Sequence, residues 1–299
     1  MKTKILIFFL AFFSMLQLQA INIATPISSG AWRNVAWLNL LPNCAYPDNS
    51  EFVSYNINLS KDLTLSGAVE VNGLDISADD LSFSVLNGGD LTVENRINAN
   101  NHNFSINLFS GGKLSCKDFE GFNAYEGRKF SMNFLGGEFV CEGTRGWLRN
   151  SVRITWNFGG VYNGVFYPAK EKSVNAGRSI EFGSVRGGEH LVNFNLSKEN
   201  AVSSAKELNY EKAIIFCKDR AGISSFAYDF SHVKIGDFRK GRYYFPLISS
   251  KNDVNIDSAK NNSDNMPTFL EFRGVHKKQM QNKKGGAVFL IYIEVEVLE

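Results

Sequence analysis

The chain has 299 residues, 44% of them apolar, so it can bury a substantial core and intrinsic disorder is excluded. Its 32 Lys and Arg residues against 30 Asp and Glu residues give a formal net charge of +2. That balance excludes bulk electrostatic attraction to polyanions, and we expect no nucleic-acid partner.

Residues 1–20 have the three-part layout of a secretory signal peptide. Lys2 and Lys4 precede an apolar run over residues 5–13, and a more polar stretch ends at Ala20. The apolar run is far shorter than the roughly 20 residues that span a bilayer, so we expect no transmembrane span. We expect cleavage after Ala20, which makes the protein secreted, bound at the cell surface or periplasmic. Because Lys2 and Lys4 are lost, the mature chain carries 30 basic and 30 acidic residues and is neutral.

Residues 21–50 are predicted to form an N-terminal cap. They contain Trp32, Trp37, Cys44 and three of the six prolines of the chain. Such a composition suits a segment that covers an open strand edge and an exposed core at the end of a repeat array.

A five-residue pattern recurs after this segment. It reads apolar, Ser or Thr, apolar, Asn or Ser, apolar, and it occurs at residues 53–57, 81–85, 104–108, 130–134 and 154–158, with a weaker sixth copy at 178–182. Glycine pairs follow four of the copies, at Gly88 and Gly89, Gly111 and Gly112, Gly136 and Gly137, and Gly159 and Gly160. Alternation of apolar and polar residues predicts short strands, and glycine suits the corners between them.

The recurrence of like residues at one interval predicts an all-β fold, a right-handed single-stranded parallel β-helix (solenoid) over residues 51–196. An antiparallel sandwich also has short, regularly spaced strands, but it does not require like residues to recur. Residues 197–299 are predicted to form a β-rich C-terminal cap, in which only residues 197–210 tolerate a helix.

One outward column of the repeat consists of Asn56, Asn107, Asn133 and Asn157. We expect a ladder of side-chain amides between coils, with a row that contacts a ligand as the alternative.

The chain resembles the passenger regions of bacterial autotransporter-type β-helix proteins. Residues 63–71 and the glycine-pair coils are similar to passenger repeats, and residues 228–231, 241–249 and 292–297 are similar to the C-terminal end of such passengers. No segment reads as the translocator barrel of that family. The resemblance implies a secreted β-helix with a structural or adhesive role.

Asp75, Asp79 and Asp80, joined by Asp90, are the candidates for the carboxylate pair that glycoside hydrolysis requires. Adjacent Asp79 and Asp80 are similar to the paired aspartates of polygalacturonases, but the Gly-His-Gly and Arg-Ile-Lys elements of that family are absent. We interpret the four residues as carboxylates that solvate a corner between coils, so no catalytic residue is predicted. They match no calcium-loop spacing, and neither a metal nor a cofactor is predicted.

Cys116 and Cys141 each lie five residues after the first glycine of a pair, so they occupy the same position in adjacent coils. Their predicted separation allows either a stack of buried thiols or a disulfide. Both alternatives are structural, because no histidine in the repeat could activate a thiol.

These patterns favour a non-enzymatic secreted protein with a structural, adhesive or cell-surface-associated role, whose partner would be a carbohydrate or another cell-envelope protein. The alternative is an extracellular polysaccharide lyase, glycoside hydrolase or carbohydrate-binding module on the same scaffold. An enzyme would bring carboxylates together with Arg or Lys in a groove on one face.

Overall fold

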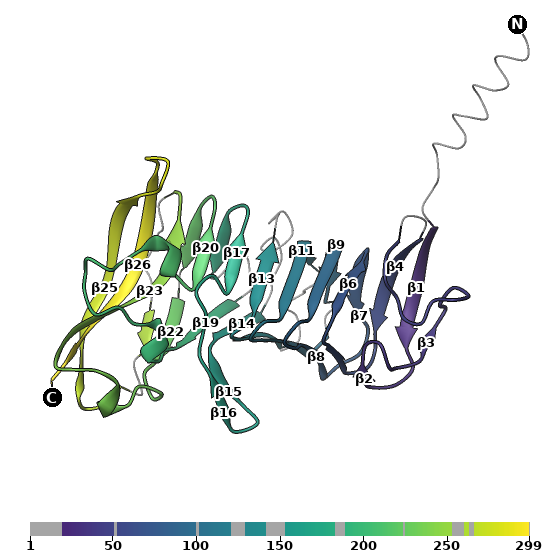
Figure 1. Ribbon diagram of the computed structural model, residues 1–299, viewed down its shortest axis with the longest axis horizontal. Coiled ribbons are helices and arrows are strands. Elements are labelled where there is room, and N and C mark those ends of the chain that lie inside the picture. The colour runs from purple at the N-terminus through teal and green to yellow at the C-terminus, as the bar shows by residue number, and fades with distance from the viewer. Residues whose placement is uncertain are drawn as a thin grey trace, which may run out of the picture.

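The computed structural model is all-β and is built mostly from parallel sheets. It describes residues 20–50, 53–99, 102–120, 129–141, 153–182, 189–223, 225–252, 260–262 and 266–298, so the expected signal peptide lies outside the described residues except for Ala20. In Figure 1 the strands lie side by side along the long axis, from β3 (Trp37–Leu38) and β1 (Ala20–Pro26) at one end to β26 (Ala287–Val297) and β25 (Leu270–Gln281) at the other. Across these residues there is no helix with the length and apolar character to cross a bilayer.

One large sheet has nine strands, and every neighbouring pair is parallel. Parallel neighbours need a crossover, so the chain leaves this sheet and returns to it between successive strands. In sheet order, which is also chain order, the strands are β2 (Gly30–Ala31), β5 (Leu63–Leu65), β8 (Leu81–Val85), β10 (Phe104–Phe109), β12 (Phe130–Leu135), β14 (Arg153–Phe158), β19 (Glu189–Asn195), β22 (Ser225–Asp229) and β24 (Lys260–Asn262).

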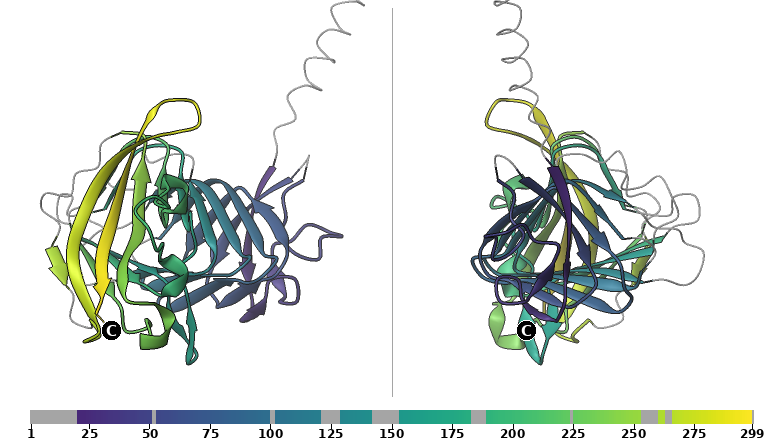
Figure 2. Two further views of the ribbon diagram at one scale, coloured as in Figure 1. Left: turned by 60° about the vertical axis from the view of Figure 1, so that its left-hand side comes forward. Right: turned by 90° about the vertical axis from the view of Figure 1, so that its right-hand side faces the viewer.

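The other large sheet has 13 strands. Its parallel part contains β1, β4 (Val53–Leu59), β6 (Ala68–Val71), β7 (Gly73–Ile76), β9 (Asp90–Asn98), β11 (Lys113–Glu120), β13 (Glu138–Cys141), β17 (Val174–Ala176), β20 (Ile215–Cys217) and β23 (Gly241–Ser250). At its ends the pairing is antiparallel: β3 (Trp37–Leu38) joins β1, while β26 and then β25 (Leu270–Gln281) follow β23. Between these ends the chain repeatedly leaves one large sheet, contributes a strand to the other, and returns. Seen from the β1 end in Figure 2, successive strands lie behind one another.

The remaining elements are small. A hairpin of β15 (Gly160–Tyr162) and β16 (Val165–Tyr167) projects from the middle of the molecule in Figure 1. β18 (Ile180–Phe182) and β21 (Ala221–Ile223) form a parallel pair. The described helical segments are 3₁₀ turns at Lys198–Asn200, Tyr210–Lys212 and Ile235–Asp237, so the helix-tolerant stretch 197–210 forms only a short turn at each end.

The register predicted for four of the six repeat copies is confirmed. Leu81, Phe104, Phe130 and Ile154, the first residues of these copies, are Cα partners in neighbouring parallel strands. Like residues therefore stand beside each other through the middle of the nine-stranded sheet.

The other two copies lie elsewhere, and this corrects the sequence alignment. Residues 53–57 are part of β4 in the 13-stranded sheet, and β5 takes their expected place beside β8. Residues 180–182 form β18 in a separate pair, and β19 continues the nine-stranded sheet instead, with Asn193 beside Asn157. Alternating polarity identifies a strand, but it does not say which of two sheets the strand joins.

Parallel pairing also extends past the range 51–196 expected for the coils. On the N-terminal side β1 pairs with β4 and β2 pairs with β5, so part of the expected cap 21–50 belongs to the two sheets. On the C-terminal side β20, β22, β23 and β24 continue both sheets within the expected cap 197–299.

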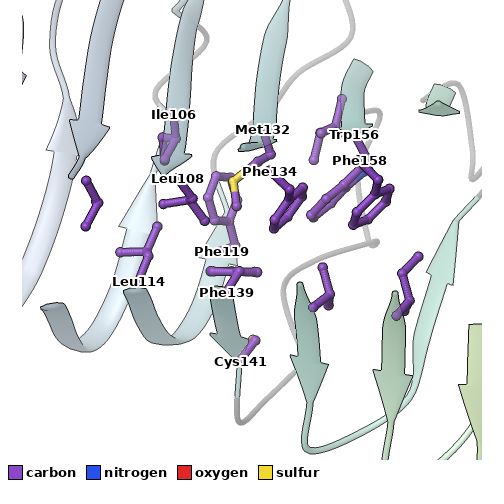
Figure 3. Packing of buried hydrophobic residues seen from close by; sticks show 14 of the residues in the cluster. Ile106, Leu108, Leu114, Phe119, Met132, Phe134, Phe139, Cys141, Trp156 and Phe158 are labelled. Atoms are coloured by element: carbon purple, nitrogen blue, oxygen red, sulfur yellow. The ribbon is translucent and has the colours of Figure 1, made fainter. Parts of the chain in front are cut away.

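The core lies between the two sheets, where their apolar columns face each other. Figure 3 shows Ile106, Met132 and Trp156 from the nine-stranded sheet opposite Leu114 and Phe139 from the other sheet. Rings also stack from strand to strand: the centroids of Phe134 and Phe158 are 4.6 Å apart, and those of Phe158 and Phe194 are 5.2 Å apart. Each such ring pair stabilises the fold by about 0.5–1.5 kcal/mol beyond the contribution from burying its apolar surface.

Candidate functional site

An amide ladder runs across the outward side of the nine-stranded sheet. The Nδ2 atom of Asn133 donates to Oδ1 of Asn107, Asn157 donates to Asn133, and Asn193 donates to Asn157, each at 2.8 Å. Asn107 ends the ladder by donating to the hydroxyl groups of Ser82 and Ser84. The ladder predicted for Asn107, Asn133 and Asn157 is therefore confirmed, and these amides hold adjacent strands together.

Asn56 belongs to a different ladder, which corrects its assignment to the first column. Asn72 donates from Nδ2 to Oδ1 of Asn56 at 2.6 Å, and Asn95 donates in the same way to Asn72. The backbone N–H of Asn95 also donates to the carbonyl of Asn72, at 2.9 Å. We call Asn56, Asn72 and Asn95 the corner ladder; it lies on the 13-stranded sheet because β4 joins that sheet.

A polar cleft of about 490 Å³ opens beside the corner ladder. We call it the corner cleft. Its lining consists of Asn56, Asn72, Gly73, Asp75, Asn95, Arg96, Lys117 and Asp118. Its volume lies within the range of about 300–1,000 Å³ that is usual for small-molecule sites.

The corner cleft lies where the sheet is irregular. Strands β6 and β7 are separated by Asn72 alone, and both pair with β9. The pairing of β9 with β11 shifts register between Cys116 and Asp118. Irregularities of this kind bend a strand and re-aim its side chains, which explains why polar groups of four neighbouring strands, β4, β7, β9 and β11, line one cleft.

Gly73 lines the cleft and leaves room for the Asn56 amide of the corner ladder, because glycine has no side chain. A Cβ atom built on this residue would lie 2.9 Å from Oδ1 of Asn56, closer than real Cβ contacts allow. Any larger residue would displace the Asn56 amide from the ladder.

The charged side chains among the described lining residues are two carboxylates, Asp75 and Asp118, and two cations, Arg96 and Lys117, so their formal charges cancel. Within the described part of the chain, the side chains of Asp75, Asp118 and Lys117 make no hydrogen bond or ion pair with the protein. Asp75 and Asp118 are half-buried and Lys117 is exposed. Within these described residues, the three polar side chains are therefore not used to hold the fold together.

Of the four aspartates considered as an acidic cluster, only Asp75 lines the corner cleft. Asp79 accepts a hydrogen bond from the backbone N–H of Asn103 at 2.8 Å, which ties together two segments 24 residues apart. Asp80 is exposed in a turn, with a φ of 58°. The second carboxylate of the cleft is instead Asp118, which sequence reasoning missed.

Asp90 lies in a second groove, of about 400 Å³, that follows the stacked glycine corners. Its carboxylate is 3.5 Å from Nζ of Lys113, and Glu138 is the register partner of Lys113 on the neighbouring strand β13. Alternating charges on adjacent strands favour their pairing. The groove is otherwise lined by the first three glycine pairs and by residues 170–172.

Cys116 and Cys141 are register partners, as predicted, and both are buried free thiols. Burial raises the pKa of the Cys116 thiol well above its ordinary value, and a hydrogen bond with Cys141 raises it further. Cys217 continues the same column two strands later, and burial raises its pKa to about 11 against the opposing effect of backbone hydrogen bonds. Thiols that stay protonated are poor nucleophiles and poor metal ligands, so this column is a packing feature.

Sequence reasoning missed most residues of the corner cleft. Asn72 and Asn95 are 23 residues apart, which is also the interval between two repeat copies, so a comparison of asparagines at coil spacing would have found the corner ladder. No periodic signal marks Arg96, Lys117 or Asp118, because they lie at the register shift. Among the described residues no group of three or more His, Cys, Asp or Glu side chains is placed to hold a metal ion.

Neither a family profile nor a curated protein nor a solved structure matches this chain.

Proposed function

We propose that this protein is an exported, right-handed parallel β-helix with a non-enzymatic, adhesive role at the cell surface. The scaffold is supported by the passage of the chain between two parallel sheets and by the like residues paired along them. Right-handedness follows the strong general preference of parallel crossovers.

Export is supported by residues 1–20 and by the position of the first strand. β1 begins at Ala20, the expected cleavage point, and Ile21 is already paired with Ser54. Cleavage there would release a chain that starts directly with the first strand of the sheet.

The observation that carries the adhesive role is the corner cleft. It gathers carboxylate, amide and cationic groups, three of which have no partner within the described residues. Groups left unpaired by the fold are available to a ligand. A general acid, by contrast, has to be kept protonated near neutral pH, usually by apolar surroundings, and the part of the chain that the structure describes puts no apolar side chain in the lining of this cleft.

A carbohydrate-active enzyme is the second candidate. The observation in its favour is that Asp75 and Asp118 share one cleft with Arg96 and Lys117, which is the arrangement expected of such an enzyme. An adhesive protein releases its ligand unchanged, whereas a carbohydrate-active enzyme cleaves it.

The test exposes the purified chain, from residue 21 onward, to a panel of insoluble polysaccharides and isolated cell envelopes. Both retention of the protein and release of soluble sugar are measured. Retention without release supports the adhesive role, whereas catalytic release of sugar supports the enzyme. Failure to be retained on any surface overturns the adhesive proposal.

Export is tested separately by expressing the whole chain in a Gram-negative host and sequencing the N-terminus of the mature protein. Ile21 as the first residue, in a fraction outside the cytoplasm, is the expected result. A cytoplasmic protein with residues 1–20 intact would contradict it.

A further inference from the structure

We propose that the corner cleft is a binding site for a neutral saccharide, held through its vicinal hydroxyl groups. The inference rests on the adhesive role proposed above and names the class of ligand. Binding at the cleft can still be measured on the isolated chain, independently of export and of retention on surfaces.

First, the corner ladder leaves some of its amide donors and acceptors available for hydrogen bonds to a ligand. Asn72 uses its amide in both directions, as donor to Asn56 and as acceptor from Asn95. The Nδ2 donor of Asn56 and the Oδ1 acceptor of Asn95, at the two ends of the ladder, have no partner within the described residues. The cleft therefore offers donors and acceptors together, as hydroxyl groups require, since each hydroxyl both donates and accepts.

The second step is the charge balance. An anionic ligand such as a phosphate or a uronate would face the carboxylates of Asp75 and Asp118, and a cationic ligand would face Arg96 and Lys117. A neutral ligand meets both kinds of group without repulsion. Hydrogen bonds to charged partners are also stronger than those between neutral groups, so carboxylates are effective acceptors for sugar hydroxyls.

The third step excludes other neutral ligands. Among the described residues no apolar side chain lines the cleft, so a lipid or an aromatic compound would have none of them to pack against. A peptide added as an extra strand needs an open sheet edge, but β7, β9 and β11 each have strand neighbours on both sides. Hydroxyl-rich ligands are the class that remains.

The lining also sets the expected strength of binding. Aromatic side chains, which supply much of the contact area in tight sites, do not occur among the described residues of the lining. We therefore expect a dissociation constant on the order of 0.1–1 mM for one site. Many copies on one surface would raise the overall avidity without any new contact.

The experiment is calorimetric titration of the chain from residue 21 onward with neutral oligosaccharides of two to six units: gluco-, manno-, xylo- and galacto-oligosaccharides. Oligogalacturonate and inorganic phosphate are the charged comparisons. The variants are Asp75→Asn and Asp118→Asn, which keep the shape of the side chain but remove the charged acceptor. We expect at least one neutral oligosaccharide to bind, and each variant to bind it about tenfold more weakly.

The matched control is Asp80→Asn, the same chemical change at an exposed turn outside the cleft, where Asn also tolerates a positive φ. Its affinity should equal that of the unchanged protein. Urea unfolding of all variants shows whether each one folds, and a folded Asp118→Asn variant is sufficient if Asp75→Asn does not fold.

Three results would overturn the inference: no neutral oligosaccharide binds at about 10 mM, the charged probes bind more tightly than the neutral ones, or both cleft variants bind within twofold of the control. If the double variant Asp75→Asn, Asp118→Asn is still retained on polysaccharide surfaces, the saccharide site lies elsewhere and the adhesive role stands. The two proposals therefore fail in distinguishable ways.

Discussion

Asn133 lies between two like residues on neighbouring strands: its Nδ2 atom donates to Asn107, and its Oδ1 atom accepts from Asn157, both at 2.8 Å. The same three residues are backbone register partners. A shift of one strand by a single residue would break the ladder and move apolar side chains outward. The ladder therefore reinforces the register that the apolar columns already favour.

The first prediction concerns this ladder. Asn133→Ala removes two side-chain hydrogen bonds and leaves the buried Asn107 amide oxygen without its donor, so we expect a loss of about 2–3 kcal/mol in the free energy of unfolding. Urea denaturation measures it. The control Ser131→Ala, in the same strand and on the same face, should cost less than about 0.5 kcal/mol. Equal effects of the two variants would mean that the ladder does not stabilise the stack.

A second prediction concerns the glycine corners. A Cβ atom on Gly112 would lie 2.5 Å from the carbonyl oxygen of Val85 at the end of β8, so the backbone would have to move. We expect Gly112→Ala to cost more than about 2 kcal/mol or to prevent folding. Gly236→Ala, where a Cβ meets nothing within 4 Å, is the control and should be close to neutral. If Gly112→Ala and Gly236→Ala unfold at the same temperature, the backbone at Gly112 does not approach Val85 as closely as described.

The cysteines give a third prediction. Cys44 is exposed, whereas Cys116, Cys141 and Cys217 are buried. We expect a thiol reagent at pH 8 to modify one cysteine in the folded protein and all four after denaturation, counted by mass spectrometry. Rapid modification of Cys116 or Cys141 in the native protein would show that their column is not packed as described.

The raised pKa of Cys217 gives a fourth prediction, for alkaline pH. An acid whose pKa is higher in the folded protein contributes stability that is complete below its ordinary pKa and is lost as the pH rises through the folded value. For Cys217 this loss of stability occurs between about pH 9 and about pH 11. The free energy of unfolding should fall by roughly 2–3 kcal/mol across it from this thiol. In the Cys217→Ala variant the free energy of unfolding should fall by that much less over the same pH range. If the variant and the unchanged protein show the same pH dependence, the pKa of Cys217 is not raised by folding.

The periodic parts of the fold could be predicted from the sequence, and the irregular parts could not. Phe104, Phe130 and Ile154 recur at coil spacing because identical environments select similar residues, so their strands and register were foreseeable. Residues 53–57 follow the same pattern but belong to the other sheet, since polarity does not encode which sheet a strand joins.

The same reasoning applies to the candidate site. Asp75 was considered from the sequence, but as a partner of Asp79 and Asp80, which are near it in the chain. The other carboxylate that lines the cleft, Asp118, lies two strands further along the sheet, beside a register shift that no periodic pattern marks. Sites built at such irregularities depend on long-range pairing, which only the folded structure supplies.

A crystal structure of the exported chain, solved after soaking with the neutral oligosaccharide that binds most tightly in titration, tests both the proposed scaffold and the proposed site. We expect a right-handed parallel β-helix with the sugar in the corner cleft, its hydroxyl groups within hydrogen-bond distance of Asp75 and Asp118. A coil of the opposite hand, or a sugar bound away from these two carboxylates, would contradict it.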